Sequence, residues 1–265
     1  MRVYEIPEGS KNSKGRAIQN LINIEQDDRV KAFICTQDLK DEDYVNSNYV
    51  IMATKMGQVK KTSLEQYSRP RSNGINAITI KDGDELLEAK LTNGNSQIML
   101  AVQSGKAIRF EESKTRPMGR NASGVRGIRL KDKKDEVVGM ISVNDMDANI
   151  LVVSENGFGK RSSLEDYRLT NRGGKGVKTI SITEKTGKLV SLKSVSDNDD
   201  LMIINKSGIA IRMQVEDLRV MGRATQGVKV ISLKDGDSIA AVAKVMKDED
   251  DIEDVNEIEF TGDTV

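Results

Sequence analysis

Short apolar runs separated by polar, glycine-containing segments recur along most of the chain. The apolar run at residues 98–102 is followed by Ser104 and Gly105, and strand-forming side chains return at residues 107–110. This order predicts a β-hairpin turned at the glycine. A polar and basic loop follows the hairpin and ends at Gly124.

Two further strands complete the segment. Residues 125–130 alternate apolar and polar side chains, and residues 137–141 form another apolar run. Asp82–Gly83 and Asp235–Gly236 lie between the third and fourth strands of other segments, where such pairs favour type I′ turns. The spaced oxygen ligands of a calcium loop are missing there. No long stretch has helical periodicity, so the pattern predicts an all-β fold with four strands per segment.

The pattern is an internal repeat of about 51 residues. The block Lys60–Tyr67 recurs 100 residues later as Lys160–Tyr167. The hairpin glycines are Gly57, Gly105, Gly157 and Gly208. The glycines before the third strands, which we call the second glycines, are Gly15, Gly74, Gly124, Gly176 and Gly227. Because a four-stranded sheet of this size cannot bury both faces alone, we expect the repeats to stack as blades of a propeller-like disc.

The repeats also divide the chain into one β-domain over residues 1–247 and a tail. Complete blades are expected at residues 49–97, 98–149, 150–200 and 201–247, after a partial blade at 1–48 and before the tail at 248–265. In the partial blade, strands are expected at Arg2–Ile6, Ala17–Ile22 and Val30–Cys35, with an insertion at Asp38–Asp43. Nothing there matches the opening strand of the other repeats, which indicates that Met1 is an internal residue of a longer protein.

Composition excludes several classes of function. The absence of histidine excludes Ser-His-Asp triads, zinc-hydrolase motifs and haem sites. The single cysteine, Cys35, excludes an internal disulfide or a cysteine-based zinc site and is expected to be a small buried side chain. No run of 18 apolar residues occurs, so we expect a cytoplasmic protein without a membrane partner. A nucleotide-binding loop is excluded at residues 157–160, because Arg161 follows the lysine.

Charge is distributed unevenly although the net charge is zero. Residues 248–265 contain nine acidic side chains and no basic one, which leaves residues 1–247 with 41 basic and 32 acidic side chains, a net charge of +9. This division predicts a body that binds a polyanion and an acidic, disordered tail. Aromatic residues make up only 3% of the chain, which disfavours stacking on single-stranded bases.

Basic residues recur at fixed places in the repeat. Four residues after the hairpin glycines stand Lys61, Arg109, Arg161 and Arg212. The loops that end at the second glycines contain Lys11, Lys14, Arg69, Arg71, Arg120, Arg172, Lys175 and Arg223. Just after the second glycines come Arg16, Arg126, Lys178 and Lys229. One such residue alone is an ordinary solvated charge, but their recurrence predicts a basic stripe around the disc rim. A stripe of this kind suits the uniform backbone charge of duplex DNA.

With these motifs, the repeats resemble the C-terminal domain of bacterial DNA gyrase A, part of a type IIA topoisomerase. The segments that carry the resemblance are residues 2–9, 118–120, 124–130, 156–161 and 220–228. The resemblance extends to about residue 247 and implies a six-bladed β-pinwheel, of which this chain holds most of the second blade and blades three to six. The first blade, with the family's Gln-Arg-Arg-Gly-Gly-Lys-Gly box, is absent. A box-like motif in what would be the fifth blade consists of Asn171, Arg172, Gly173, Gly174, Lys175 and Gly176.

The resemblance implies binding, bending and wrapping of duplex DNA without sequence specificity. The holoenzyme would use this wrap for ATP-dependent negative supercoiling of the bacterial nucleoid. The implied protein partners are the remainder of gyrase A and the separate chain gyrase B. Because other parts of the holoenzyme use ATP and magnesium and carry the catalytic residues, no catalytic residue, metal site or cofactor is expected in this chain.

Alternatives stay open from the sequence. The equivalent domain of topoisomerase IV has similar repeats but a degenerate box, so the box-like motif and the acidic tail favour gyrase. A propeller used as a protein-interaction scaffold would carry apolar or mixed-charge rim loops in place of basic columns. A catalytic propeller is disfavoured, because the chain offers no repeated acid pair and no histidine.

Overall fold

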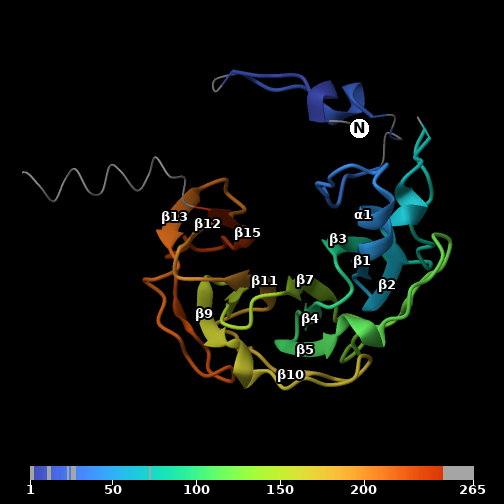
Figure 1. The fold of residues 1–265 in the computed structure, drawn as a ribbon. Coiled ribbons are helices and arrows are strands. Elements are labelled where there is room, and N and C mark those ends of the chain that lie inside the picture. The colour runs from blue at the N-terminus through green and yellow to red at the C-terminus, as the bar shows by residue number, and fades with distance from the viewer. Residues whose placement is uncertain (1–2, 11–12, 23, 25–27, 72, 247–265) are drawn as a thin grey trace, which may run out of the picture.

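The chain folds into antiparallel sheets arranged around an arc (Figure 1). The computed structural model describes residues 3–10, 13–22, 24, 28–71 and 73–246. The first sheet contains β1 (Tyr49–Thr54), β2 (Gln58–Ser63), β3 (Leu86–Thr92) and β6 (Val125–Arg126). The second contains β4 (Gln97–Val102), β5 (Lys106–Glu111), β7 (Val137–Val143) and β10 (Val177–Lys178). The third contains β8 (Asn149–Ser154), β9 (Phe158–Ser163), β11 (Leu189–Val195) and β14 (Val228–Lys229). The fourth contains β12 (Asp199–Asn205), β13 (Ala210–Gln214) and β15 (Ile239–Met246). The expected all-β propeller-like fold is therefore confirmed.

Each of the first three sheets takes its outermost strand from the following repeat. The strand order of the first sheet is β3-β1-β2-β6, and β6 comes from the repeat that builds the second sheet. Strands β10 and β14 cross over in the same way. The pairings place Val125 opposite Val59, Val177 opposite Ala107 and Val228 opposite Gly159. The sequence predicted four strands per repeat, and the structure adds that the third strand joins the preceding sheet.

The second glycines permit this close crossing. Gly124, Gly176 and Gly227 all have positive φ, and a Cβ at any of them would lie 2.5 Å from a carbonyl oxygen of the preceding hairpin. A side chain there would collide with backbone that cannot move aside. Within the described residues, the fourth sheet has three strands, and none of them is supplied by another repeat.

The core lies between neighbouring sheets, which explains why the β4 sequence is continuously apolar. Ile98 and Leu100 pack with the first sheet, and Met99 and Ala101 pack with the third. All four are 0% exposed, so both faces of the second sheet are buried. Since alternate residues of a strand point to opposite faces, a strand between two sheets requires an apolar side chain at every position. The inner strands also meet one another, with β7 in contact with β3 and β11.

The partial blade does not form the three expected strands, and this prediction was wrong. Residues Val3–Glu5 and Ile18–Asn20 are short 3-10 helices, and residues 30–35 form no regular strand although Ile34 packs against the hydrophobic cluster beneath β1 and β3. Part of the expected Arg2–Ile6 strand lies outside the described residues. A strand is held by its cross-strand hydrogen bonds, and no strand of the described residues pairs with these segments.

The insertion expected at residues 38–43 leads into a helix. Helix α1 (Glu42–Ser47) is capped by Asp41, whose side-chain oxygen accepts a hydrogen bond from the Tyr44 amide at 3.0 Å. This helix packs against the end of β2 and the 3-10 turn that follows it, at residues Leu64–Tyr67. Corresponding 3-10 turns, at Glu112–Lys114 and Leu164–Asp166, follow β5 and β9.

The two Asp-Gly turns differ from the expected type. Gly83 and Gly236 have φ of 75° and 80°, but no residue other than glycine has positive φ in the described part of the chain. A type I′ turn needs positive φ at both central residues, so Asp82 and Asp235 exclude that type. The turns are nevertheless closed, since the amides of Asp84 and Asp237 donate to the carbonyls three residues earlier at 3.0 Å.

Candidate nucleic-acid interface

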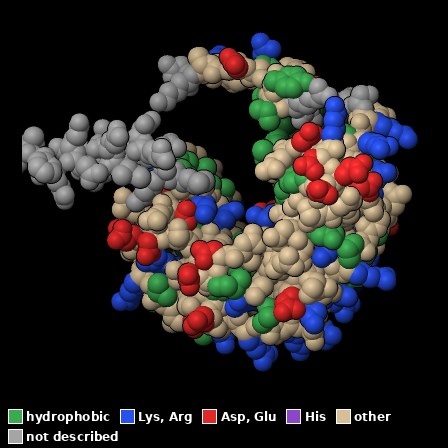
Figure 2. Space-filling model, in the orientation of Figure 1, with side chains coloured by type: hydrophobic (Ala, Val, Ile, Leu, Met, Phe, Trp, Pro, Cys, Tyr) green, Lys and Arg blue, Asp and Glu red, His purple; other side chains and the backbone are tan. Residues whose placement is uncertain are grey.

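Basic side chains gather along the outer edge of the arc, on the side where β5 and β10 lie (Figure 2). The short strands β6, β10 and β14 form the outer edges of their sheets, and the loops that precede them cross from one repeat to the next. Nine of the side chains predicted from the sequence are exposed: Lys14, Arg16, Arg69, Arg71, Arg126, Lys175, Lys178, Arg212 and Lys229. Another predicted residue, Lys11, lies outside the described residues.

A repeated contact joins the loop of one repeat to the outer strand segment of the repeat before it. The Arg172 guanidinium donates to the carbonyl oxygens of Arg126 at 3.0 Å and Lys114 at 2.9 Å. The same contact occurs in three repeats, and its acceptor is always the residue two positions after one of the second glycines. We call these hydrogen bonds, each from a guanidinium group to a backbone carbonyl oxygen, the first, second and third seams. They run from Arg120 to Asn76 at 3.3 Å, from Arg172 to Arg126 at 3.0 Å and from Arg223 to Lys178 at 2.8 Å.

The seams bring positive charges from successive repeats together. At the second seam, the carbonyl of Arg126 accepts the bond from Arg172 while its own side chain remains exposed. Lys178 stands in the same relation to Arg223 at the third seam. Among the described residues, none of these four side chains has a carboxylate ion-pair partner. Neighbouring cations without a carboxylate attract a polyanion.

The column four residues after the hairpin glycines has a structural role, which corrects the prediction that it faces DNA. Lys61 and Arg161 are only 5% and 7% exposed. Lys61 lies 3.5 Å from the Glu112 carboxylate, and Arg161 binds the Leu218 carbonyl and the Asp197 carboxylate. The loop of the following repeat covers both residues, so their charges are compensated inside the protein and do not reach the rim.

Arg109 serves the same purpose between the second and third sheets. Its Nη1 donates to the carbonyl oxygens of Leu164 at 2.9 Å and Tyr167 at 3.0 Å, and its side chain is half-buried. Arg212 is the last member of this column, and its Nε donates to the Asp200 carboxylate at 2.7 Å. Three members of the column therefore tie successive repeats together, whereas Arg212 pairs within its own sheet. We leave Lys61, Arg109, Arg161 and Arg212 out of the candidate interface because their charges or donors are used within the protein.

Two buried lysines were missed by the sequence analysis. Lys60 and Lys160 occupy equivalent positions on β2 and β9 and are both 0% exposed. The Lys60 ammonium donates to the carbonyl oxygens of Ala77 and Arg120, and Lys160 donates to that of Gly222 at 2.6 Å. Burial, and after it the charge of Arg120, lowers the pKa of Lys60 to about 8. Burial likewise lowers the pKa of Lys160 to about 8. Both lysines hold the loops that carry seam arginines.

A further exposed column was also missed. Arg116, Arg168 and Arg219 stand four residues before the three seam arginines and are all exposed. Their fixed spacing in the sequence could have revealed them. Because they lie on the same loops as the seam arginines, they extend the basic surface of each loop.

The box-like motif packs against the preceding repeat. The amide of Gly173 donates to the Gly127 carbonyl at 2.6 Å, and the Gly174 carbonyl accepts from the Arg129 amide at 2.8 Å. These backbone groups are therefore used within the protein, while the Lys175 side chain is exposed and Arg172 forms the second seam. The motif contributes to the rim through its side chains.

We also searched the described part of the chain for a metal site and a membrane span, and located its single cysteine. No group of three or more metal-ligating side chains is placed to hold an ion there. No described helix is long and apolar enough to cross a membrane. Cys35 is exposed, which corrects the expectation of a buried side chain. Residue 35 lies in the segment that forms no strand, and it lines a pocket together with residues of β3.

A family model described as "DNA gyrase C-terminal domain, beta-propeller" matches residues 1–37, 48–93, 97–144, 148–196 and 199–246. The A subunit of DNA gyrase from Staphylococcus aureus is 43% identical over 267 residues, with 100% of this chain and 29% of that protein covered. The Staphylococcus epidermidis protein of the same name is 43% identical over 251 residues, with 94% and 28% covered. The chain thus spans less than a third of the length of these relatives.

Two solved structures have a similar fold. The structure of a DNA gyrase A C-terminal domain matches with a TM-score of 0.78 and 25% identity, with 93% of this chain and 78% of that one covered. The C-terminal domain of a DNA topoisomerase IV matches with a TM-score of 0.84 and 24% identity, with 98% and 80% covered. The second likeness concerns the fold alone.

Proposed function

The chain belongs to the family of DNA gyrase C-terminal β-propeller domains, and we propose that it binds duplex DNA along the outer edge of its sheets. The observation that carries the proposal is the repeated seam, where Arg172 and Arg223 lie on the backbone of the exposed basic residues Arg126 and Lys178. A basic pair that recurs once per repeat matches a ligand whose charge is uniform along its length. The duplex backbone is such a ligand.

Binding of this kind is expected to be independent of sequence. Long basic side chains at loop ends reach phosphates, whereas reading of bases needs an element inserted into a groove. The described residues offer short strands and loops for this contact, and their one α-helix, α1, has only six residues. We therefore propose that phosphate contacts supply the affinity.

The curved arrangement of the sheets supports bending as the mechanical outcome. Because successive seams lie on successive sheets of the arc, a duplex that contacts several of them must follow its curvature (Figures 1 and 2). Bending a site of 20 to 30 base pairs by 40 to 90° costs roughly 1 to 6 kcal/mol, so several contacts are needed to offset it. We propose that the energy for wrapping is spread over the repeats.

For the whole protein, we propose the role of the gyrase A C-terminal part in ATP-dependent negative supercoiling in the bacterial cytoplasm. The remainder of gyrase A and the separate chain gyrase B would be its partners, and the catalytic steps would lie outside this chain. The 43% identity to gyrase A of Staphylococcus aureus favours this assignment. The alternative is the corresponding domain of topoisomerase IV, which the similarity of fold keeps open. A protein-interaction scaffold is disfavoured by the exposed basic loops.

We also propose residues 1–247 as the DNA-binding domain and residues 248–265 as a separate acidic tail. Residues 247–265 lie outside the described part, so this boundary rests on the family match, which reaches residue 246, and on the acidic charge that begins at residue 248.

The proposal is tested by wrapping on circular DNA. Closed circles are relaxed in the presence of the 265-residue chain, or of a chain extended by the preceding repeat, and the linking number is measured after the protein is removed. A shift that grows with protein concentration is expected, and the extended chain is expected to give the larger one. Circles that bind neither chain, or bind both without any shift in linking number, would contradict wrapping.

A further inference from the structure

A pocket lies at the first seam. The pocket has a volume of about 630 Å³ and is lined by Arg69, Arg71, Asn73, Gly74, Ile75, Asn76, Arg120 and Asn121. These residues come from two loops, one before β3 and the other before β6. No acidic residue lines the pocket, and its only large apolar side chain is Ile75.

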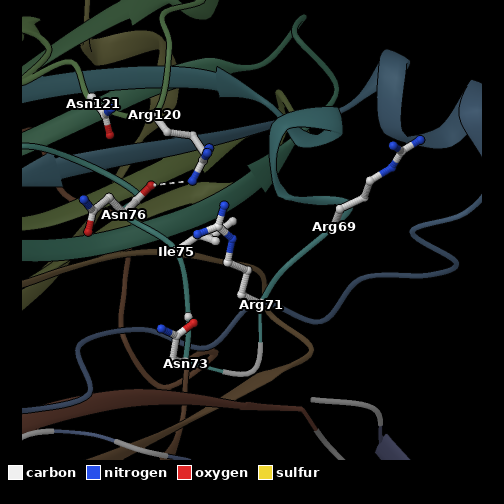
Figure 3. A pocket seen from close by; sticks show the side chains of 8 residues that line it. Arg69, Arg71, Asn73, Ile75, Asn76, Arg120 and Asn121 are labelled. Carbon is white, nitrogen blue, oxygen red and sulfur yellow. Dashed lines mark hydrogen bonds between the residues drawn. The ribbon is translucent and has the colours of Figure 1, made fainter.

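Two of the three arginines face one another across this pocket. Figure 3 shows the side chains of Arg71 and Arg120 pointing toward the same space, whereas Arg69 points away. Arg71 is exposed, and the structure gives its guanidinium no hydrogen-bond or ion-pair partner among the described residues. Arg120 makes a single long side-chain bond, of 3.3 Å to the Asn76 carbonyl. Most of the donors of both guanidinium groups are therefore free.

A third cation lies behind these two. The buried Lys60 ammonium donates to the carbonyl of Arg120 in one loop and to that of Ala77 in the other. It therefore fixes the separation of the two loops and adds a positive charge beneath the pocket. None of these three cations has a carboxylate ion-pair partner among the described residues. Three uncompensated cations repel one another, and an anion between them would relieve that repulsion.

The first seam differs from the other two in which residue supplies its second positive charge. At the second and third seams, the exposed cation beside the seam arginine is Arg126 or Lys178. The equivalent residue here is Asn76, which is neutral. Arg71, which precedes the second glycine, supplies the cation from the other side. With Arg71 in place of a basic residue at position 76, the seam still has two cations, and they lie on opposite walls of the pocket.

We propose that this pocket binds one phosphate group, held between the guanidinium groups of Arg71 and Arg120. Planar guanidinium groups bind phosphate oxygens through paired hydrogen bonds, and the side-chain amides of Asn73 and Asn121 are further donors at the wall. The lining offers no aromatic face for a base, so the site recognises the phosphate and not a nucleoside. The same chemistry is presented by a phosphodiester of the duplex backbone and by a free phosphoryl anion. The duplex source rests on the function proposed above.

The test compares R71Q with wild type in two assays on the 265-residue chain. In the first, inorganic pyrophosphate is titrated and the arginine Nε–H signals are followed by NMR. In the second, the affinity for a 30-base-pair duplex is measured as a function of salt. We expect R71Q to lose the saturable pyrophosphate shift and to reduce the magnitude of the log-log salt slope by about one, because one phosphate contact contributes about 0.9.

K133Q is the matched control, since Lys133 is an exposed lysine outside the pocket and the seams and its replacement changes the net charge equally. It is expected to keep both signals. R120Q serves as a second variant and should also abolish the pyrophosphate shift. Thermal unfolding confirms that R71Q is folded, as expected for an exposed side chain.

The outcomes distinguish the duplex backbone from a free phosphoryl anion as the source of the phosphate group. They also distinguish failure of the pocket proposal from failure of the proposed duplex binding. A changed salt slope without pyrophosphate binding identifies the duplex backbone as the source. Pyrophosphate binding by a wild-type chain that does not bind duplex supports the pocket and contradicts the proposed function. If R71Q behaves as wild type in both assays while the duplex still binds with a steep salt dependence, the pocket proposal is overturned and the proposed function stands.

Discussion

The guanidinium of Arg172 donates a hydrogen bond to the backbone carbonyl of Arg126, 3.0 Å away and 46 residues earlier in the chain. The bond uses the backbone of Arg126 and leaves that side chain exposed, so two cations from different repeats are held side by side. Arg126 lies on β6, the outer strand of the first sheet, and Arg172 lies in the loop that leads to β10, the outer strand of the second sheet. The charged surface is thus a product of the connection between repeats.

Duplex binding should weaken steeply with salt. If five or six of the exposed basic residues neutralise phosphates at once, the slope of log affinity against log salt should be near −5, because each contact contributes about −0.9. Fluorescence anisotropy of a labelled duplex between 50 and 200 mM salt measures the slope. An affinity that stays flat over this range would contradict a phosphate-binding rim.

Bending should depend on all the seams together. Replacing Arg120, Arg172 and Arg223 by alanine in one protein should reduce the bend more than any single replacement, because each seam offsets only part of the roughly 1 to 6 kcal/mol bending cost. Energy transfer between dyes at the two ends of a duplex reports the bend. The control replaces Lys131, Lys133 and Lys134, three exposed lysines of one turn, and removes the same charge. A single seam variant that abolishes bending would indicate one localised site instead.

Replacing Lys160 by isoleucine should remove a pH dependence of stability. Isoleucine stands at the equivalent positions 108 and 211. The pKa of Lys160 is lowered from 10.5 to about 8 by burial, with Arg223 and Lys178 acting in the same direction and Asp166 opposing them. Above pH 8 the folded chain releases a proton that the unfolded chain keeps until about pH 10.5, so the free energy of unfolding contributed by this group rises with pH in that window.

One pKa unit corresponds to about 1.4 kcal/mol, so the wild type should gain about 1 to 3 kcal/mol relative to K160I between pH 7.5 and 9.5. Urea unfolding at both pH values measures the difference. Tyr167 hydrogen-bonds Thr179 in the same repeat, and burial raises its pKa above 10.0, so its opposing effect begins only at higher pH. Parallel changes in the two proteins would contradict a buried lysine with a lowered pKa.

Gly176→Ala should destabilise the fold more than Gly74→Ala. Both glycines have positive φ, which disfavours alanine by about 1 to 2 kcal/mol. At Gly176 the new Cβ would also lie 2.5 Å from the Ala107 carbonyl oxygen, whereas nothing lies within 4 Å at Gly74. Thermal or urea unfolding of the two variants isolates the contribution of the strand crossing. Equal losses would show that the close approach of β10 to β5 contributes little.

Deleting residues 248–265 should tighten duplex binding at low salt. The tail carries nine carboxylates and no basic side chain, and its attachment to the body gives these carboxylates a high effective concentration at the basic rim, so it should compete with DNA. Salt screens both interactions, and the gain should therefore shrink as salt is added. Affinity measured with and without the tail at two ionic strengths tests this. An unchanged affinity at low salt would leave the tail without a role in DNA binding.

The sequence by itself determined the local structure of the repeats. The apolar runs such as residues 98–102, the hairpin glycines and the 51-residue period predicted the hairpins and the stacking of four-stranded sheets. These features follow from side-chain alternation and turn geometry within a few residues, so they can be recognised without knowledge of the partners. The partial blade shows the limit, because residues 17–22 and 30–35 have strand-forming composition, yet no strand in the described part of the chain pairs with them.

Only the tertiary structure decided which hairpin receives each third strand, and with it which basic columns face solvent. Lys61 and Arg126 both recur as basic residues at a fixed place, yet one is 5% exposed and the other is exposed on an outer strand. The sequence around Lys60 and Lys61 contains no sign that the next repeat covers them. Their burial results from hydrogen bonds between residues about 60 positions apart, such as the bond from Lys60 to the Arg120 carbonyl. Local periodicity cannot specify such contacts, because they depend on how separate repeats pack in space.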